Sequence, residues 1–413
     1  MSNFPIDQVR AQFPALDVTD NGRRRIYFDG PGGTQACRPA IEAMAGHLRG
    51  GTANAGGAFC SSAATDAMSR AAHQAMADLL GGEPGEIAFG PNMTTLTFSL
   101  SRALARDWQA GDEVVVTRLD HEANVSPWLH AASDRGALVR WLDVDPGTGT
   151  LRLDQLPGLL GPRTRLVAIG GASNAIGTIN DVEAAVRAVR AGSDALVFVD
   201  AVQSVPHLPT DVRALGCDFL ACSPYKFFGP HQGVLWGRAA LLERLEAYKV
   251  RPASINPPAV RLETGTPSFE GQAGVLGTID YLEWLGRLLA PASGSRRDAL
   301  LAAMHGSLAY EHALGERLIE GLGRVPGLRL YGPPGMAGRV PTFGFTMEDH
   351  APRDIAAFLA ERGIFVWSGS FYAIEPVERL GLTGAGGLVR VGLCHYNSAE
   401  EVDLLIEALL ELA

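Results

Sequence analysis

The sequence is short of cysteine and of long apolar runs, and both absences narrow its class. Its five cysteines are an odd number without paired close spacing, so we expect reduced, mostly buried thiols and neither a disulfide framework nor a metal site. No uninterrupted apolar run reaches the length of a membrane span, and residues 1–13 lack the basic segment and apolar core of a secretion signal. We therefore expect a cytoplasmic protein with no membrane partner.

Positive charge is also scarce, which argues against a nucleic-acid partner. The formal net charge is −10, and no dense cluster of lysine and arginine reverses that balance locally. The chain has 413 residues, of which 46% are hydrophobic and 19% charged. This composition is typical of a soluble globular protein, and the length suits a large domain joined to a smaller one.

Short apolar runs predict an α/β fold with a mainly parallel sheet. The clearest runs lie at 113–117, 165–169, 195–199 and 219–222. Helical segments such as 182–189 separate them, so we expect helices on both faces of the sheet. Ligands of such sheets bind beyond the carboxyl ends of the strands. Four residues with suitable chemistry each follow one of these runs and are expected to share a site: His121, Asn174, Asp200 and Lys226.

Changes in composition divide the chain into three predicted parts. Residues 1–25 are expected to form an N-terminal arm, residues 26–290 a large domain, and residues 291–413 a smaller α+β domain. The Pro-Ala-Ser-Gly-Ser stretch at 291–295 is the best candidate for the linker. In the smaller domain, strands are expected at 328–331, 342–346 and 388–393, with helices at 354–362 and 399–412. An aromatic loop at 367–373 lies between them.

Lys226 stands between two aromatic residues, shortly before a Gly-Pro turn. An amine held against aromatic rings at a strand end is desolvated, which lowers its pKa and suits it to act as a nucleophile toward carbonyl cofactors. The alternative is a lysine whose stem packs on Phe227 while its charged head reaches water. The stretch alone leaves both interpretations open.

Two loops also allow a functional and a structural interpretation. The loop at 29–33, Asp-Gly-Pro-Gly-Gly, either lets the backbone approach a ligand, with Asp29 and Gly30 on the substrate side, or is a plain tight turn. Further on, a helix is expected to begin near Met93. Its free N–H groups and the hydroxyl of Thr94 suit a phosphate, although a threonine there could simply cap the helix.

Five short motifs follow one another along the chain. They are Asp-His-Glu-Ala-Asn at 120–124, Ser-Asn-Ala-Ile-Gly-Thr at 173–178, Asp-Ala-Val-Gln at 200–203, Ser-Pro-Tyr-Lys at 223–226 and Gly-Thr at 265–266. In this order they resemble the class V aminotransferase family of pyridoxal-phosphate enzymes, and within it the cysteine-desulfurase-like branch. The resemblance covers nearly the whole chain. It implies fold type I, with a seven-stranded type of sheet in the large cofactor-binding domain, and a homodimer with the cofactor between subunits.

The resemblance also implies roles around the pyridoxal 5'-phosphate ring. Lys226 would form the Schiff base and Asp200 would contact the pyridine nitrogen. A carboxylate there keeps the nitrogen protonated, so that the ring accepts electrons from a substrate carbanion. Gln203 and Asn174 would hold the phenolic oxygen, and His121 would stack on the ring.

The remaining implied contacts concern the phosphate and the substrate. Met93, Thr94 and Ser223 would hold the phosphate, and Thr266 would reach it from the partner subunit. Tyr225 belongs to the same neighbourhood, where many desulfurases have a histidine. Arg390 matches the arginine that grips the substrate carboxylate, a task that suits a bidentate guanidinium; a surface salt bridge is the alternative.

A second departure from the desulfurases concerns sulfur transfer. Where they carry a persulfide-forming cysteine in a loop, this chain has Trp-Ser-Gly-Ser-Phe-Tyr-Ala at 367–373. A tyrosine cannot accept sulfur as a thiolate does. Cys394 lies close to Arg390 in the sequence, but its apolar strand indicates a core residue. Cys60 is a weaker candidate for a sulfur acceptor.

These features favour an enzyme that acts on an amino acid or an amino-acid conjugate. Lys226 would remove the α-proton, after which the outcome is β-elimination as in a carbon–sulfur lyase, epimerisation or transamination. Tyr372 could act as an acid toward a leaving group. Desulfuration with another thiol as acceptor is the main alternative. A non-catalytic scaffold is opposed by the joint presence of Lys226, Asp200, His121 and Arg390.

Overall fold

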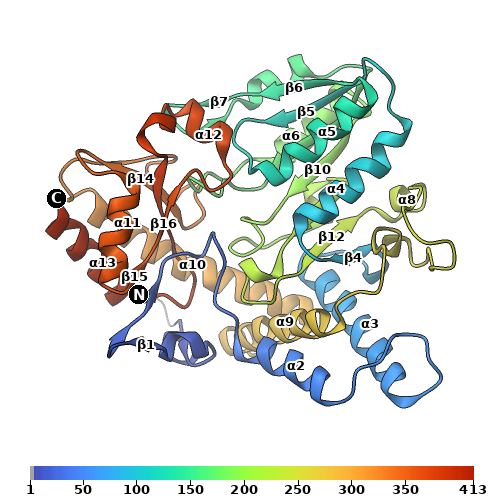
Figure 1. Cartoon of the computed structure of the whole chain (residues 1–413), viewed down its shortest axis with the longest axis horizontal. Coiled ribbons are helices and arrows are strands. Elements are labelled where there is room, and N and C mark those ends of the chain that lie inside the picture. Colours follow the sequence, from blue (N-terminus) through green and yellow to red (C-terminus); the bar gives the residue numbers. More distant parts are fainter. Residues whose placement is uncertain (1–3) are drawn as a thin grey trace.

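The computed structural model describes residues 4–413 and shows a seven-stranded sheet as the centre of an α/β fold (Figure 1). The strand order is β4-β12-β11-β10-β9-β5-β6. β12 is antiparallel to both neighbours, whereas the other pairs are parallel. The strands are β4 (Ile87–Gly90), β5 (Glu113–Thr117), β6 (Leu138–Leu142), β9 (Thr164–Gly170), β10 (Leu196–Asp200), β11 (Phe219–Cys222) and β12 (Gly233–Gly237). The expected mainly parallel sheet is confirmed.

Helices cover both faces of this sheet. Side chains alternate between the two faces along each strand, and since both sets are apolar, both faces must be buried. Val114 and Val116 of β5 pack in one apolar cluster with Leu96 and Trp128, whereas Val115 packs in another with Leu79. The helices of this part are α2 (Arg38–Arg49), α3 (Cys60–Leu80), α4 (Met93–Leu104), α5 (Ser126–Arg135), α6 (Val182–Gly192), α7 (Val212–Leu215), α8 (Ala239–Leu242) and α9 (Phe269–Leu289).

Helix α10 (Arg296–Leu322) packs on α9 and leads to a second, four-stranded sheet. A Cβ on Gly286 of α9 would lie 1.7 Å from the carbonyl oxygen of Ala299, so the close approach of the two helices requires glycine. The second sheet is antiparallel, in the order β13-β14-β17-β16. Its strands are β13 (Leu328–Leu330), β14 (Thr342–Met347), β16 (Trp367–Gly369) and β17 (Leu388–Gly392), and the accompanying helices are α11 (Pro352–Glu361), α12 (Ile374–Arg379) and α13 (Ala399–Leu412).

The N-terminal segment returns to the C-terminal part of the chain. It contains α1 (Ile6–Arg10), the short hairpin β1 (Thr19–Asp20) and β2 (Arg23–Arg24), and β3 (Ile26–Tyr27). β3 pairs in parallel with β15 (Ile364–Phe365), and Asp29 bridges to Gly392 of β17. The division at residues 25 and 290 stays a prediction. The pairing nevertheless delivers the loop after β3 to the edge where the strands of the large sheet end.

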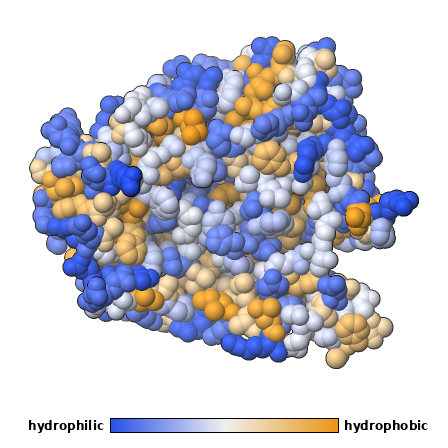
Figure 2. All heavy atoms as spheres, in the orientation of Figure 1, coloured by the Kyte–Doolittle hydropathy of each residue, from blue (hydrophilic) through white to orange (hydrophobic). Residues whose placement is uncertain are grey.

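The face shown in Figure 1 mixes hydrophilic and hydrophobic residues (Figure 2). Hydrophobic groups gather over α2, where Ile41 and Leu48 are 45% and 56% exposed. Of the helices between residues 4 and 413, none is both long and apolar enough to cross a bilayer.

Candidate active site

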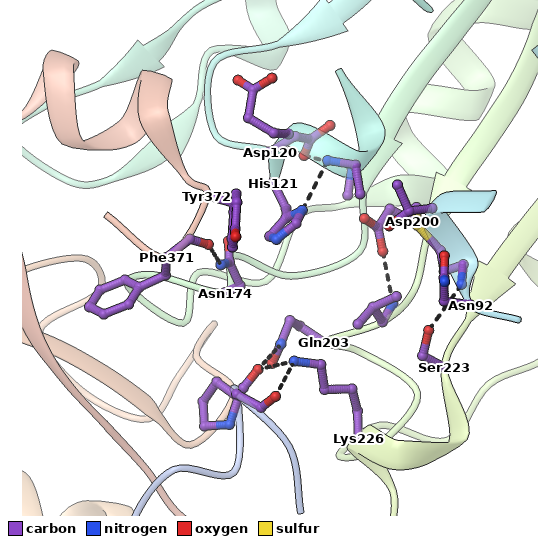
Figure 3. A pocket seen from close by; sticks show the side chains of 18 of the residues that line it. Asn92, Asp120, His121, Asn174, Asp200, Gln203, Ser223, Lys226, Phe371 and Tyr372 are labelled. Carbon is purple, nitrogen blue, oxygen red and sulfur yellow. Dashed lines mark hydrogen bonds between the residues drawn. The ribbon is translucent and has the colours of Figure 1, made fainter. Parts of the chain in front are cut away.

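A cavity of about 880 Å³ opens where β4, β5, β9, β10 and β11 end (Figure 3). This volume is at the upper end of the range for sites that enclose a small molecule, about 300–1,000 Å³. Twelve residues singled out from the sequence line it: Asp29, Met93, Thr94, His121, Asn174, Asp200, Gln203, Ser223, Tyr225, Lys226, Tyr372 and Arg390. Residues more than 300 positions apart therefore meet in one site.

Two predicted site residues do not line this cavity. A Cβ on Gly30 would lie 2.6 Å from Sγ of Cys394, so Gly30 packs against that thiol behind the cavity wall. Thr266 lies in an exposed loop. This position is compatible with the expected role of Thr266 in a partner subunit's site, which stays a prediction.

Lys226 ends a short 3-10 helix, Pro224–Lys226, directly after β11. It is one of only two lysines in the sequence, the other being Lys249. Its side chain is buried, and its Nζ lies 4.7 Å from the centroid of the Tyr225 ring. Burial, followed by the charge of Arg390, lowers the pKa of Lys226 to about 7. A neutral amine is therefore available near neutral pH.

Two carboxyl groups lie one behind the other at the strand ends. Asp200 ends β10, accepts a hydrogen bond from the Val202 N–H (2.9 Å), and has its pKa raised to about 6 by burial. Asp120 accepts from the Gly170 N–H (2.9 Å), and burial together with the charge of Asp200 raises its pKa to about 8. A buried carboxylate such as Asp200 is stabilised by a cationic partner, and a protonated pyridine nitrogen is such a partner.

His121 presents a neutral ring to the cavity. Its Nδ1 accepts a hydrogen bond from the Ala123 N–H (2.9 Å). Burial, with the charges of Lys226 and Arg390, lowers the pKa of His121 to about 4. An uncharged imidazole held in this way suits stacking on an aromatic cofactor.

The amide side chains of Asn174 and Gln203 face the same space. Asn174 donates from Nδ2 to the Phe371 carbonyl (2.9 Å), while its Oδ1 is buried and has no partner. Gln203 donates from Nε2 to the Pro31 carbonyl (2.9 Å). A buried polar atom without a partner marks a place that a ligand can complete.

The N-terminus of α4 forms the end of the cavity that suits a phosphate. Asn92 caps this helix by accepting a hydrogen bond from the Thr95 N–H (2.8 Å). Since Asn92 and not threonine is the cap, the hydroxyl of Thr94 is left for a ligand. Ser223 lies at the same end, where its Oγ accepts a hydrogen bond from the Met93 N–H (3.3 Å). Backbone N–H groups at a helix N-terminus bind phosphate well.

Arg390 of β17 lies at the other end of the cavity and is 4% exposed, which rules out a surface salt bridge. Its guanidinium lies 4.3 Å from the centroid of the Phe371 ring and donates to Oδ1 of Asp29 (3.4 Å). The second oxygen of Asp29 accepts from Nε1 of Trp367 (2.6 Å). Burial raises the pKa of Asp29, against the opposing effect of Arg390. The Arg390–Asp29 ion pair therefore borders the cavity.

The segment at 367–373 closes this end of the cavity, and its first three residues form strand β16 rather than the expected loop. Phe371 and Tyr372 both have a positive φ, of 58° and 57°. The Glu122 N–H donates to the Tyr372 carbonyl (2.8 Å), and the Tyr372 ring lies 5.6 Å from that of His121. The backbone is therefore fixed, although the Tyr372 side chain is 72% exposed.

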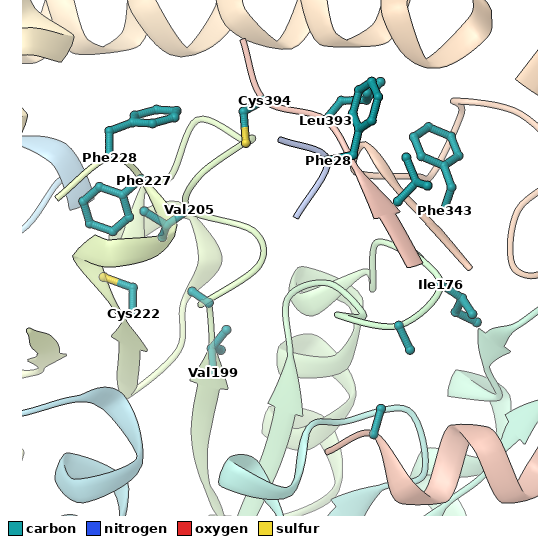
Figure 4. Close-up of a cluster of buried hydrophobic side chains, with 14 of the residues drawn as sticks. Phe28, Ile176, Val199, Val205, Cys222, Phe227, Phe228, Phe343, Leu393 and Cys394 are labelled. Atoms are coloured by element: carbon teal, nitrogen blue, oxygen red, sulfur yellow. The ribbon is translucent and has the colours of Figure 1, made fainter. Parts of the chain in front are cut away.

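None of the cavity-lining residues that the structure describes is a cysteine. Cys394 is 1% exposed and packs among buried apolar side chains such as Phe228 and Leu393 (Figure 4). Burial raises the pKa of its thiol. The expectation that Cys394 is a core residue agrees with this position. Between residues 4 and 413, no group of three or more histidine, cysteine or acidic side chains is arranged to hold a metal ion.

Some cavity residues had no predicted role. Asp120 belongs to a motif noted in the sequence, but nothing there indicated that it lies behind Asp200. The carbonyl groups of Pro31 and Gly32 also have no sequence signal, because any residue type carries one. Trp367 was noted only as an aromatic, and its contact with Asp29 depends on the pairing of β16 with β17.

Comparisons with known proteins agree with this geometry. The sequence profile of the family described as Aminotransferase class-V matches residues 26–405. A cysteine desulfurase of Klebsiella pneumoniae is 33% identical over 425 residues, covering 98% of each chain. The apo structure of a cysteine desulfurase from Thermococcus onnurineus has a TM-score of 0.87 and 27% identity, covering 100% of this chain and 98% of that one. A cysteine desulfurase from Escherichia coli has a TM-score of 0.82 and 27% identity, covering 100% of both.

The N–H groups at the start of α4, the Asp200 carboxylate and the unpaired Oδ1 of Asn174 suit pyridoxal 5'-phosphate. The family profile spans nearly the whole chain. The chain belongs to the class-V aminotransferase family and is a pyridoxal-phosphate-dependent enzyme of fold type I.

Proposed function

We propose that this enzyme removes the α-proton of an amino acid or amino-acid conjugate and eliminates a sulfur-bearing β-substituent, as a carbon–sulfur lyase does. One observation carries the proposal: among the described residues that line the cavity, none offers a thiol that could accept sulfur. Persulfide formation needs an accessible thiolate. The relatives named cysteine desulfurase support a sulfur-containing amino acid as the substrate. Together these points favour cleavage of the carbon–sulfur bond without transfer of sulfur to the protein.

Arg390 is proposed to bind the substrate carboxylate. Its guanidinium is buried, and its Nε has no partner. A carboxylate that enters the cavity gains two charge-assisted hydrogen bonds from this fork. Asp29 would then keep its contact with Trp367 alone. The substrate is thereby oriented with its Cα toward Lys226.

The side chains around the ring are proposed to hold the cofactor, which supplies an electron sink for the substrate carbanion. Asp200 would neutralise the pyridine nitrogen, His121 would cover one face, and Asn174 with Gln203 would contact the phenolic oxygen. Met93, Thr94, Ser223 and Tyr225 surround the phosphate end. Each of these residues lines the cavity.

Lys226 and Tyr372 are proposed to move the two protons. The Lys226 amine, with a pKa lowered to about 7, is neutral enough to take the proton from Cα. The hydroxyl of Tyr372, at the mouth of the cavity, would give a proton to the leaving sulfur. The energetic need for this second proton increases with the basicity of the leaving group.

Desulfuration is the second candidate, favoured by the names of the relatives. It would need an external thiol or another cysteine, because Cys394 is buried with a raised pKa. Epimerisation and transamination require the same α-proton step and differ only in the later steps of the reaction. A non-catalytic scaffold would not need the full set of buried ionisable groups.

Product analysis distinguishes these outcomes. The cofactor-loaded enzyme should convert L-cysteine or an S-alkyl-L-cysteine to pyruvate, ammonia and sulfide or thiol. Lys226→Ala is the matched control and should slow this reaction about 10²–10⁴-fold, the usual contribution of a general base, and lose the visible absorption band of the bound cofactor. Alanine with sulfide as products would overturn elimination in favour of desulfuration.

A further inference from the structure

Thr34 holds both ends of the turn that carries Lys226. Its backbone N–H donates to the Tyr225 carbonyl (2.9 Å), and its hydroxyl donates to the same oxygen (3.1 Å). The hydroxyl also accepts a hydrogen bond from the Phe228 N–H (2.7 Å). One threonine, 191 positions away from Tyr225 in the sequence, therefore fixes the backbone on both sides of Lys226.

The turn needs such support because Phe228 has a φ of 75°. A bulky side chain in this left-handed region is strained, and surrounding contacts must maintain it. The Cys37 N–H donates to the Phe228 carbonyl (2.9 Å), which adds a second contact from the same N-terminal segment. The geometry of the lysine turn thus depends on residues 34–37.

The Lys226 amine is held by the same segment. Its Nζ donates to the carbonyl oxygens of Pro31 and Gly32, the latter at 2.9 Å. Figure 3 shows the amine directed at this loop. A Cβ on Gly32 would lie 2.3 Å from Oδ1 of Asp29, so a larger residue there would displace the Asp29 carboxylate. Two of the three donors of the ammonium are satisfied by main-chain oxygens.

We propose that Thr34 is a positioning residue for Lys226, and that the carbonyl oxygens of Pro31 and Gly32 are the resting place of the Lys226 amine whenever it is free of the cofactor. During turnover the amine lone pair takes the proton from the substrate Cα, and the electron pair of the C–H bond stays with the substrate carbon. The resulting ammonium donates to the two carbonyl oxygens until the proton passes to the departing product or to water. The inference rests on the part of the proposed function that links Lys226 to the cofactor, and it is independent of the leaving group.

Other charges and rings also act on this amine, and a test must hold them constant. They are Asp29, Asp200, Arg390, His121 and the Tyr225 ring. Substitutions at Thr34 leave Asp29, Asp200, Arg390 and His121 unchanged and outside the turn that Thr34 fixes, so a change in the Lys226 pKa can be assigned to the position of that turn, Tyr225 included.

The scarcity of lysine makes a direct measurement feasible. Lysine labelled with ¹³C at Cε gives two signals in the cofactor-free chain of 413 residues, one from Lys226 and one from Lys249. Lys249 is an internal control, because its Nζ also donates to two carbonyl oxygens, those of Ser254 (2.9 Å) and Val260 (2.6 Å). Lys226→Ala assigns the signals.

We expect the titration midpoint of Lys226 to fall by about one pH unit in Thr34→Val, about the effect of losing one hydrogen bond to a charged group. The carbonyl oxygens stabilise the ammonium, so a displaced turn lowers the pKa. Thr34→Ser keeps the hydroxyl and should titrate like the wild type, and the Lys249 midpoint should not change in either variant. In the cofactor-loaded enzyme, exchange of the substrate Cα proton should slow in Thr34→Val, with KM unchanged.

Equal Lys226 midpoints in Thr34→Val and Thr34→Ser would overturn the proposal. If Thr34→Val does not fold, a crystal structure of the cofactor-free wild type decides: Nζ lying more than about 4 Å from both carbonyl oxygens, beyond hydrogen-bonding reach, would contradict it. A different result would show that the proposed link between Lys226 and the cofactor is wrong. Lys226→Ala would then keep the cofactor absorption band whatever the titrations show.

Discussion

At the scale of single residues, the hydroxyl of Tyr372 is the group whose role is easiest to isolate. The backbone of Tyr372 is fixed by its contact with Glu122, so removal of the hydroxyl leaves the loop in place. We expect Tyr372→Phe to lower kcat about 100-fold for substrates with a basic leaving group, within the usual range for general acid catalysis. KM should not change.

Tyr248→Phe is the matched control for this experiment. Tyr248 is 52% exposed and does not line the active-site cavity. Unchanged turnover in both variants, measured with thiols of different pKa as leaving groups, would exclude Tyr372 as the acid.

At the scale of elements, the contact between β16 and the turn before β17 decides where the aromatic segment lies. Gly386 and Gly387 both have a positive φ, of 81° and 87°. A Cβ on Gly387 would lie 2.2 Å from the carbonyl oxygen of Gly369, whereas a Cβ on Gly386 meets nothing within 4 Å. A side chain would therefore strain the backbone at both positions, but only at Gly387 would it also clash with β16.

Alanine at each of these glycines separates the two effects. Gly386→Ala should cost about 1–2 kcal/mol of stability, the penalty for a left-handed residue with a side chain, and leave KM unchanged. Gly387→Ala should lower Tm further and raise KM, because it displaces the strand that brings Trp367 to Asp29. Thermal melts and initial rates check this. If the two variants behaved alike, the β16 contact would have no part in substrate binding.

Sequence patterns predicted the buried elements well, because periodic apolar residues indicate strand and helix positions directly. Strand β5 (Glu113–Thr117) and helix α13 (Ala399–Leu412) have the expected bounds. Strand β6 was not predicted, since Leu138 and Arg140 are exposed and its apolar pattern is interrupted. Helix α3 was also missed, because its many small and polar residues give weak periodicity.

The site residues also fall into a group that the sequence predicted and a group that it did not. Residues at strand ends, such as Asp200, could be predicted from the motifs, because parallel strands end at one edge of the sheet. The main-chain contacts of Lys226 could not, since Pro31 lies 195 positions away and the contact uses a carbonyl that every residue has. Trp367 was expected in a loop, but it forms a strand because it pairs with Arg390 in β17.

At the scale of the whole molecule, we propose a homodimer with the cofactor between subunits. Thr266 lies in an exposed loop away from the cavity of its own chain. Large apolar side chains are exposed on α2 and just before α3, among them Leu48 (56%) and Phe59 (58%). Exposed apolar groups of this kind are common at subunit contacts.

Light scattering should therefore give about twice the chain mass of 43.7 kDa. We expect Thr266→Ala to weaken cofactor binding about tenfold, the effect of one lost hydrogen bond to a charged group, without changing the mass. Fully active monomers at low concentration would contradict a shared site.

The two lysines have a consequence for how the protein acquires its cofactor. Pyridoxal phosphate is an aldehyde and condenses with accessible amines. Here the surface offers arginines in place of lysines, and Lys249 is engaged with two carbonyl oxygens. Few other side-chain amines therefore compete with Lys226 for the aldehyde. We expect cofactor loading to approach one molecule per chain, with little Schiff-base formation elsewhere. Because the sequence has only two lysines, the Lys226 amine is also the main target of any other reactive aldehyde that fits the cavity.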